Sequence, residues 1–260
     1  MNTLAAFKQS DEFLSDAHCH LAAQTENDHS IGQGPVIICT GHPDDWPLVI
    51  QHASPHCLPA FGIHPWQIQA STLSSAQKSI TRLQEYWPQI IAQGLPCILG
   101  EIGLDKAKAY QKTLPLQLEI LHALLDAPCP TWRILNLHVV HAWPEIFAPP
   151  LREKIFAPHQ KVILHGFKAS REIMHRLQAY PHVYFSFALK HLTEKMSLLL
   201  PDIDPARILI ESDADQPLAA DEMRELLRKT RSHIAHLGHL EPAAFAQQLK
   251  HNWQELMREI

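Results

Sequence analysis

The residues of this chain that could do chemistry are histidines and carboxylates placed at the ends of short apolar runs. His18 and His20 lie two residues apart in the segment Asp16–His20. In an extended strand, residues i and i+2 point to the same face, so these two imidazoles can bind one metal ion. Neutral imidazole is the commonest metal ligand in proteins. Because H-x-H pairs are common, the pair predicts a metal site only if further ligands lie nearby.

Further candidate ligands end four other apolar runs. These residues are Glu101, His138, His165 and Asp213. Taken singly, each has a structural explanation: Glu101 could form a salt bridge or cap a helix, and Asp213 could cap the following helix. His138 or His165 alone could be a hydrogen-bonded core histidine. Four such residues on four different strands are hard to explain in this way, so together with the H-x-H pair they predict a centre for one or two divalent cations.

The elements that must position these residues are strands alternating with helices. Eight short apolar runs recur at a spacing of mostly ~20 to 40 residues, which leaves room for one crossover helix each. The predicted strands are Leu14–His18, Val36–Thr40, Leu58–Ile63, Cys97–Ile102, Arg133–His138, Lys161–Gly166, Val183–Phe187 and Arg207–Glu211. We therefore predict an α/β fold, a single TIM-type (β/α)8 barrel with its metal site at the C-terminal ends of the strands. An open doubly wound sheet is the alternative.

Helical periodicity fills several gaps between these runs. Apolar residues at helical spacing predict one helix between Ser71 and Gln93, another through Leu114–Leu125, and a last one from about Pro242 to Met257. No linker is long enough to divide the chain. The sequence therefore predicts one barrel over residues 1–260, with residues 1–13 as an N-terminal extension.

Composition limits the classes of protein that the chain can belong to. It has 260 residues, of which 46% are hydrophobic and 19% charged, so it can bury a full core. A net charge of −5 argues against a protein that coats long nucleic acid, so any contact with nucleic acid should be local. The five cysteines form no C-x-x-C pair, which favours a reducing cytoplasm. We expect no signal peptide, no membrane span and no obligate protein partner.

Several motifs occur in an order and spacing that resemble a known family. The matching segments are Asp16–Leu21, Phe61–Trp66, Gly100–Asp105, Leu164–Phe167 and Ile210–Asp213. They resemble the D-[ST]-H-C-H-[LF], G-x-H-P, G-E-I-G-L-D, L-H-C-F and L-E-T-D elements of the TatD-type metal-dependent hydrolases, whose barrel is amidohydrolase-like. Gln111, Leu114, Gln117 and Leu118 resemble the helix after the third of these elements, and Asn252 suits the family's C-terminal asparagine. The resemblance covers residues 14 to 258.

The resemblance implies a role for each candidate ligand. His18 and His20 would bind a first metal, Glu101 would bridge two metals, and His138 and His165 would bind the second. Asp213 would contact a metal and take the proton of the attacking water. The family implies a deoxyribonuclease that trims DNA from a 3′ end. Magnesium or manganese would suit phosphodiester chemistry, and zinc would suit the four histidines.

Substrate contacts are predicted at the rim of the same site. His64 could hydrogen-bond a phosphate oxygen or order the loop before Pro65. Trp66 could stack on a base or pack internally. The family commonly has histidine, a small residue and then arginine here, but this segment reads His138-Val139-Val140-His141, so the arginine is missing and His141 could substitute for it only in part.

The missing arginine leaves two rival functions open. Arginine is the usual bidentate phosphate ligand, and Asp215 adds a carboxylate close to the site, so the substrate could be a small ester, amide or lactone. The expected partner is thus a DNA end or another small phosphodiester or ester substrate. A non-enzymatic, accessory role is the second rival.

Overall fold

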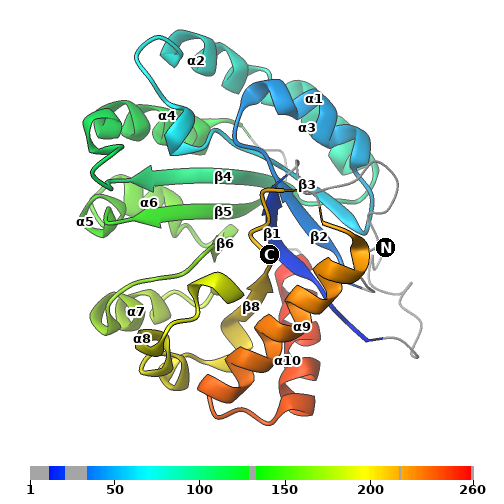
Figure 1. Cartoon of the computed structure of the whole chain (residues 1–260). Coiled ribbons are helices and arrows are strands. Elements are labelled where there is room, and N and C mark those ends of the chain that lie inside the picture. Colours follow the sequence, from blue (N-terminus) through cyan, green and yellow to red (C-terminus); the bar gives the residue numbers. More distant parts are fainter. Residues whose placement is uncertain (1–11, 21–33, 129–132, 217, 259–260) are drawn as a thin grey trace.

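The computed structural model describes residues 12–20, 34–128, 133–216 and 218–258. Their strands form a single eight-stranded parallel sheet in chain order, from β1 to β8 (Figure 1). The strands are β1 Asp16–His20, β2 Val36–Cys39, β3 Cys57–Phe61, β4 Cys97–Asp105, β5 Arg133–Val140, β6 Gln160–Leu164, β7 Val183–Ala188 and β8 Ile208–Glu211. The predicted barrel fold is confirmed.

Two backbone hydrogen bonds join the first strand to the last and nearly close the barrel. The N–H of Asp213 donates to the carbonyl of His18 at 3.0 Å, and the N–H of His20 donates to the carbonyl of Ala214 at 2.9 Å. Both bonds lie at the C-terminal ends of β1 and β8. The closure therefore brings Asp213 beside the two histidines of β1.

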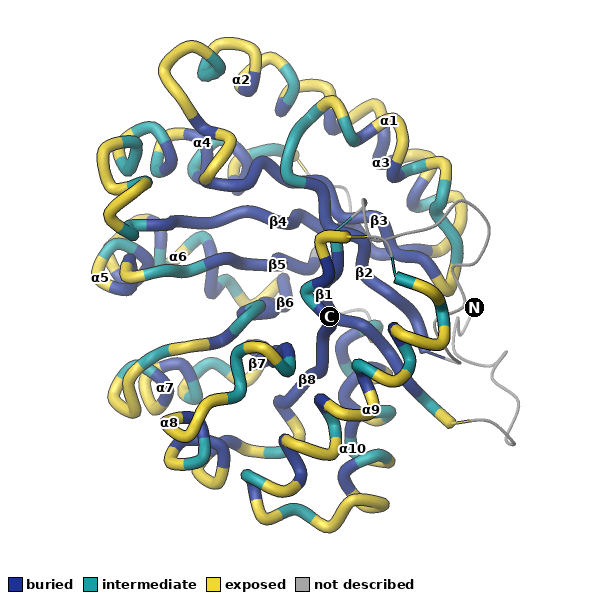
Figure 2. Tube along the Cα trace, in the orientation of Figure 1, coloured by how far each residue is buried: buried dark blue, intermediate teal, exposed yellow. Residues whose placement is uncertain are grey.

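The helices lie outside the strands and follow them in alternation (Figure 1). Their bounds are α1 Trp46–Val49, α2 Leu73–Thr81, α3 Leu83–Ala92, α4 Leu114–Asp126, α5 Trp143–Ile146, α6 Leu151–Ile155, α7 Arg171–Gln178, α8 Glu194–Ser197, α9 Ala220–Leu237 and α10 Pro242–Met257. The strands are buried almost throughout, whereas the helices alternate buried and exposed residues (Figure 2). This is the pattern of a parallel sheet covered by amphipathic helices.

The structure differs from the prediction mainly at the ends of elements. The helix predicted across residues 71–93 is two helices that adjoin at Arg82. Strands β4 and β5 continue past their predicted ends, because pairing resumes after a register shift between Leu99 and Ile102. Gly103 makes this possible: its φ is +149°, and a side chain there would collide with the backbone of His138. Glycine is therefore required at this position, where two backbones approach closely.

Candidate metal centre

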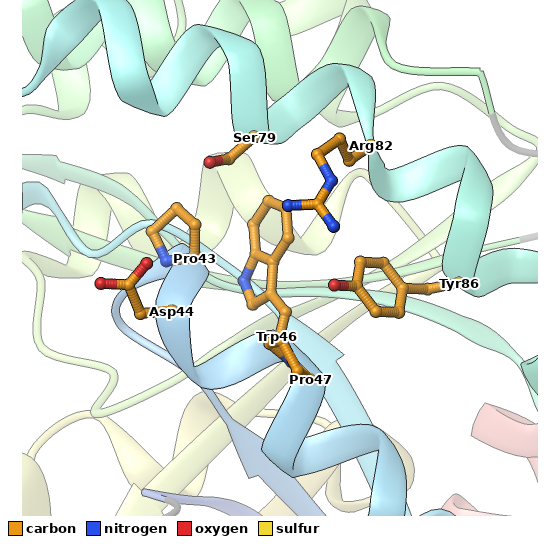
Figure 3. Close-up of a pocket in the computed structure, with 7 residues that line it drawn as sticks. All are labelled: Pro43, Asp44, Trp46, Pro47, Ser79, Arg82 and Tyr86. Carbon is orange, nitrogen blue, oxygen red and sulfur yellow. The ribbon is translucent and has the colours of Figure 1, made fainter.

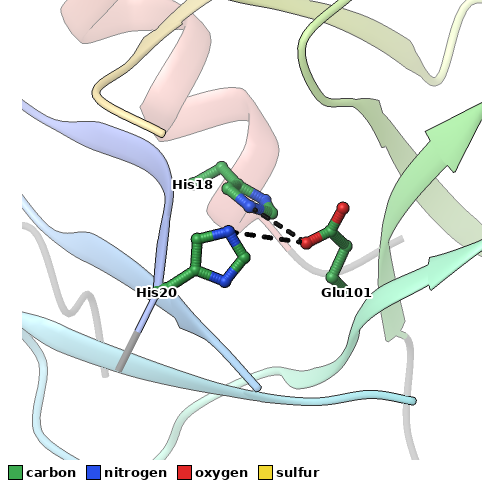
Figure 4. A group of neighbouring side chains, drawn as sticks. All are labelled: His18, His20 and Glu101. Atoms are coloured by element: carbon green, nitrogen blue, oxygen red, sulfur yellow. Dashed lines mark ion pairs between the residues drawn. The ribbon is translucent and has the colours of Figure 1, made fainter. Parts of the chain in front are cut away.

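The six predicted ligands meet at the C-terminal ends of the strands. His18 and His20 belong to β1, Glu101 to β4 and His138 to β5, while His165 directly follows β6 and Asp213 follows β8. Neighbouring parallel strands end at the same edge of the barrel, so residues far apart in the chain become neighbours. Figure 4 shows His18, His20 and Glu101 directed toward one another from β1 and β4.

One side of the cluster pairs two imidazoles with two carboxylates. The Oε2 atom of Glu101 lies 3.4 Å from His18 Nε2 and 3.7 Å from His20 Nε2. The Oδ1 atom of Asp213 lies 3.6 Å from His20 Nε2 and 4.0 Å from His18 Nε2. Within the described part of the chain, His18 Nε2 and Glu101 Oε2 are buried and have no hydrogen-bond partner. Since buried polar atoms are almost always paired, this donor set fits a metal ion.

The other oxygen of Glu101 faces three further imidazoles. Its Oε1 atom lies 2.8 Å from His138 Nδ1, 2.8 Å from His165 Nε2 and 3.0 Å from His64 Nε2. His138 Nδ1 and His165 Nε2 are themselves only 3.2 Å apart. Glu101 thus stands between two groups of histidines, the position expected of a carboxylate that is shared between two metals.

The electrostatics of the cluster keep its carboxylates ionised. Burial alone would raise the pKa of Glu101, but attraction to His165, His64 and His18 holds it well below its ordinary value. Burial would likewise raise the pKa of Asp213, and its contacts with His20 and other cationic groups outweigh this and lower it. Both side chains are therefore anionic ligands and acceptors at neutral pH.

A second layer of polar residues orients the ligands. The amide of Asn136 donates to the carbonyl of Ala17 at 2.8 Å, so its Oδ1 atom faces His18 Nδ1, at 2.9 Å, as an acceptor. This arrangement places the proton on His18 Nδ1 and leaves Nε2 as the coordinating atom. Asp16 accepts from Ser212 N at 2.9 Å and from Ser212 Oγ at 2.5 Å, which fixes the segment before Asp213 against β1.

Asp105 orients His138, which belongs to the group of histidines around the Oε1 atom of Glu101. Its Oδ2 atom lies 3.4 Å from His138 Nε2 and accepts from the indole of Trp66 at 2.6 Å. Burial would raise the pKa of Asp105, but these two contacts and the N–H of Ala107 lower it to about 2. These contacts fit an orienting role toward His138 and a capping role toward the N–H of Ala107.

The three predicted substrate residues lie in different surroundings. His64 is part of the cluster through Glu101, and its Nδ1 atom accepts from the N–H of Trp66 at 3.1 Å. Trp66 is half exposed and stacks on Tyr110, with 5.0 Å between ring centroids. His141 is exposed with a φ of +54°, and no contact with the cluster is found among the described residues. Their predicted roles with substrate stay predictions.

The sequence analysis missed some residues of the site. Asn136 carried a usable signal, because it is a polar residue inside the apolar segment Leu135–Leu137. Lys190 and His191 carried none, since the short helix Leu189–His191 after β7 matches no motif. Lys190 Nζ lies 2.9 Å and His191 Nε2 lies 3.7 Å from Asp213 Oδ2.

A small pocket elsewhere on the molecule shares no residue with this cluster. It lies beside α1, with side chains of α2 and α3 completing its wall (Figure 3). Its lining residues are Pro43, Asp44, Trp46, Pro47, Ser79, Arg82 and Tyr86. Trp46 also donates its indole N–H to the carbonyl of Gly62 at 3.1 Å, which packs this region against the barrel.

A family model described as TatD related DNase matches residues 15–258. The chain belongs to this family. Its motifs and its cluster of histidines and carboxylates are thus those of a TatD-family hydrolase, a metal-dependent class, and the groups present could hold a metal ion. No curated protein matches the chain.

Solved structures, among them two of TatD proteins, share the fold. The TatD homologue YjjV of Escherichia coli K12 is 18% identical, with a TM-score of 0.62, over 94% of this chain and 97% of the other. A TatD family hydrolase of Entamoeba histolytica is 15% identical, with a TM-score of 0.68, over 95% and 98%. The phosphotriesterase homology protein of E. coli, complexed with phosphate in its active site, is 15% identical, with a TM-score of 0.62, over 97% and 100%.

The remaining expectations concern the surroundings of the protein. Among the helices in the described parts of the chain, none combines the length and the apolar character needed to cross a membrane. The predicted cytoplasmic location and the absence of an obligate partner stay predictions. The proposed N-terminal extension falls mostly on residues 1–11, which lie outside the described residues.

Proposed function

We propose that this TatD-family member is a metal-dependent deoxyribonuclease that hydrolyses phosphodiester bonds from the 3′ end of DNA. The observation that carries the proposal is Glu101, a buried carboxylate with one oxygen toward His18 and His20 and the other toward His138 and His165. Such a donor set suits two neighbouring cations. The family supports nuclease chemistry, and the phosphate bound in one structural neighbour supports a phosphate-sized anion at this place.

The residues divide naturally into two ligand groups. His18, His20 and Asp213 would hold one cation, His138 and His165 the other, and Glu101 would contact both. Bound divalent cations supply Lewis acidity, which lowers the pKa of a water and neutralises charge on the scissile phosphate. The donor chemistry does not choose between magnesium, manganese and zinc: the carboxylates suit the first two, and the four imidazoles suit zinc.

The chain's own side chains handle the proton and the orientation. Asp213 would accept the proton of the attacking water and return it to the leaving 3′ oxygen, a role that its anionic state and its 12% exposed side chain support. Asn136 and Asp105 hold His18 and His138 in fixed orientations. His64 lies at the inner wall, where its ring borders the cluster. The half-exposed Trp66 offers a ring at the rim on which a terminal base can stack.

The first experiment follows 3′-labelled single-stranded DNA with purified protein and added magnesium, manganese or zinc. Wild type should release the label with the first nucleotide that it removes, and Asp213→Ala should not. Asp215→Ala is the matched control: it removes an exposed carboxylate two residues away and should keep the activity. Loss of label that is equal in wild type and Asp213→Ala would point to a contaminating nuclease and contradict the proposal.

A small-molecule ester, amide or lactone is the second candidate substrate. It is favoured by the absence of an arginine near position 141 and by the negative charge of Asp215 close to the mouth. Paired assays with bis(p-nitrophenyl) phosphate and p-nitrophenyl acetate separate the two candidates. Turnover of the acetate alone, lost in Asp213→Ala, would keep the hydrolase and replace its proposed substrate.

A further inference from the structure

A lysine after β7 reaches into the mouth of the barrel and contacts Asp213. Lys190 donates from Nζ to the backbone carbonyl of Asp213 at 2.7 Å and lies 2.9 Å from its Oδ2 atom. The Oδ1 atom of the same carboxylate faces His20 Nε2 at 3.6 Å. The carboxylate of Asp213 thus lies between the ammonium group of Lys190 and the imidazole of His20.

The position of this ammonium group is that of a substrate contact. The side chain of Lys190 is 52% exposed, whereas that of Asp213 is 12% exposed, so the lysine stands between the cluster and solvent. An ion pair as exposed as this one contributes little to stability. Lysine has three N–H donors, and the two contacts with Asp213 leave one for a ligand. A scissile group held at the cluster would lie within reach of it.

Other lysines at the same end of the barrel are placed differently. Lys106, which follows β4, pairs at 2.6 Å with Glu145 of α5, which is not one of the candidate metal ligands. Lys195 lies farther along the segment after β7, is exposed, and makes no contact with the cluster among the described residues. His141, the predicted partial substitute for the missing arginine, is exposed and makes no contact with the cluster among the described residues. Lys190 is therefore the cation best placed to meet an anion at Asp213.

We propose that Lys190 binds a non-bridging oxygen of the scissile phosphate and supplies the positive charge that the missing arginine would supply. This inference rests on the proposed function. An ammonium group binds phosphate as a point charge, without the bidentate geometry of arginine. With lysine in the role of arginine, the site should recognise a phosphate anion but tolerate different orientations of the rest of the substrate.

The test compares Lys190→Met, Lys190→Arg and Lys195→Met in the metal-loaded protein. Lys190→Met should raise KM for labelled DNA about 10- to 100-fold, the loss expected for one charge-assisted hydrogen bond. It should also raise the inhibition constant of inorganic phosphate about tenfold, as the same bond is lost. Lys190→Arg should keep most of the affinity, and Lys195→Met should match wild type. Metal content should be equal in all four proteins.

The outcomes separate this inference from the proposed function. If wild type leaves DNA intact, the proposed function fails, and calorimetric titration of the metal-loaded proteins with inorganic phosphate still tests Lys190. Weaker phosphate binding by Lys190→Met than by Lys195→Met would then support the phosphate contact. Unchanged KM and phosphate binding, with a lower kcat and a shifted pH profile, would show that Lys190 acts only through Asp213 and overturn the inference.

Discussion

The two ends of the barrel treat buried charge in opposite ways. At the end where the strands begin, Lys161 of β6 donates to the backbone carbonyls of Glu255 at 2.5 Å and Leu256 at 3.3 Å, and also to that of Arg258. Arg207, just before β8, spreads its guanidinium over three carbonyls, with distances of 2.8, 2.8 and 3.1 Å. Each buried cation there meets neutral acceptors at the ends of helices and strands.

At the other end, charged and titratable groups crowd together without such pairing. The rings of His18 and His165 stack with centroids 3.9 Å apart, and His138 and His165 bring two nitrogens to 3.2 Å. His18 Nε2 and Glu101 Oε2 are buried with no hydrogen-bond partner within the described residues. Hydrogen bonding at the end where the strands begin is thus of the kind that stabilises a chain, whereas crowded, unpaired titratable groups like those at the opposite end are typical of functional sites.

The largest expected effect, on both metal binding and activity, is that of replacing Glu101 at the centre of the cluster. Glu101→Gln keeps the shape of the side chain but removes the charge that two groups of histidines share. The variant should lose bound metal on dialysis, and activity should fall by at least about a thousandfold, because metal-based stabilisation of a transition state is worth several kcal/mol. Elemental analysis and the rate on whichever substrate wild type cleaves measure both effects.

The control for this variant is the thermal response to metal. Added cation should raise the Tm of wild type and leave that of Glu101→Gln unchanged, since a ligand stabilises only the state that binds it. A variant that keeps its metal and retains a rate within tenfold of wild type would remove Glu101 from the centre of the site.

A smaller effect on metal binding is expected from Asn136, which contacts the candidate ligand His18. Asn136→Ala removes the acceptor at His18 Nδ1, so the ring can rotate and its tautomer is no longer fixed. Loss of such a partner typically weakens metal binding 10- to 100-fold, and we expect about this loss here. Competition with a chelator of known affinity measures it. If Asn136→Ala binds metal as tightly as wild type, His18 is oriented by the backbone alone.

The strands of the barrel and the six clustered residues could be predicted from the sequence, whereas many of the contacts that position them could not. Apolar runs located every strand, because parallel strands are buried on both faces. The C-terminal end of β4 was predicted three residues too early, at Ile102, since only the structure shows that Gly103 lets the backbone continue beside that of His138. The six candidate ligands could be predicted to lie together because each ends or follows such a run; that they bind metal stays a prediction. Lys190 was not found, since a lysine in a loop has no distinguishing pattern until Asp213 is placed next to it.

At the end of the barrel where the strands begin, we expect a substitution to change the stability of the protein and not its catalytic rate. Lys161→Met should leave the carbonyls at the C-terminal end of α10 without their donor and reduce the free energy of unfolding by about 1–3 kcal/mol. Lys154→Met is the matched control, because Lys154 pairs with Asp126 near the surface. Urea denaturation measures the difference. The rate per folded molecule should equal that of wild type, and a fall in rate without a fall in stability would abolish the distinction between the two ends.

The smallest expected effect is on stability, and it tests whether the exposed ion pairs of Glu12 contribute as much as the buried hydrogen bonds of Lys161. Glu12 pairs with Arg228 at 2.6 Å and with Arg231, both of α9. Burial would raise the pKa of Glu12, but the two arginines lower it below 4.5. A lowered carboxyl pKa gives stability that is present above the unfolded value and lost as the pH falls through the folded value.

Glu12→Gln should therefore lower Tm by about 2 °C at pH 7, because exposed ion pairs contribute little. The difference from wild type should shrink as the pH falls below 4.5 and vanish only below the lowered pKa of the folded state, where Glu12 is protonated in both states. Glu225→Gln, which breaks an exposed pair within the same helix, should change Tm less. A Glu12→Gln effect as large as that of Lys161→Met, and constant with pH, would mean that the segment before β1 is held by packing around Glu12 and not by its charge.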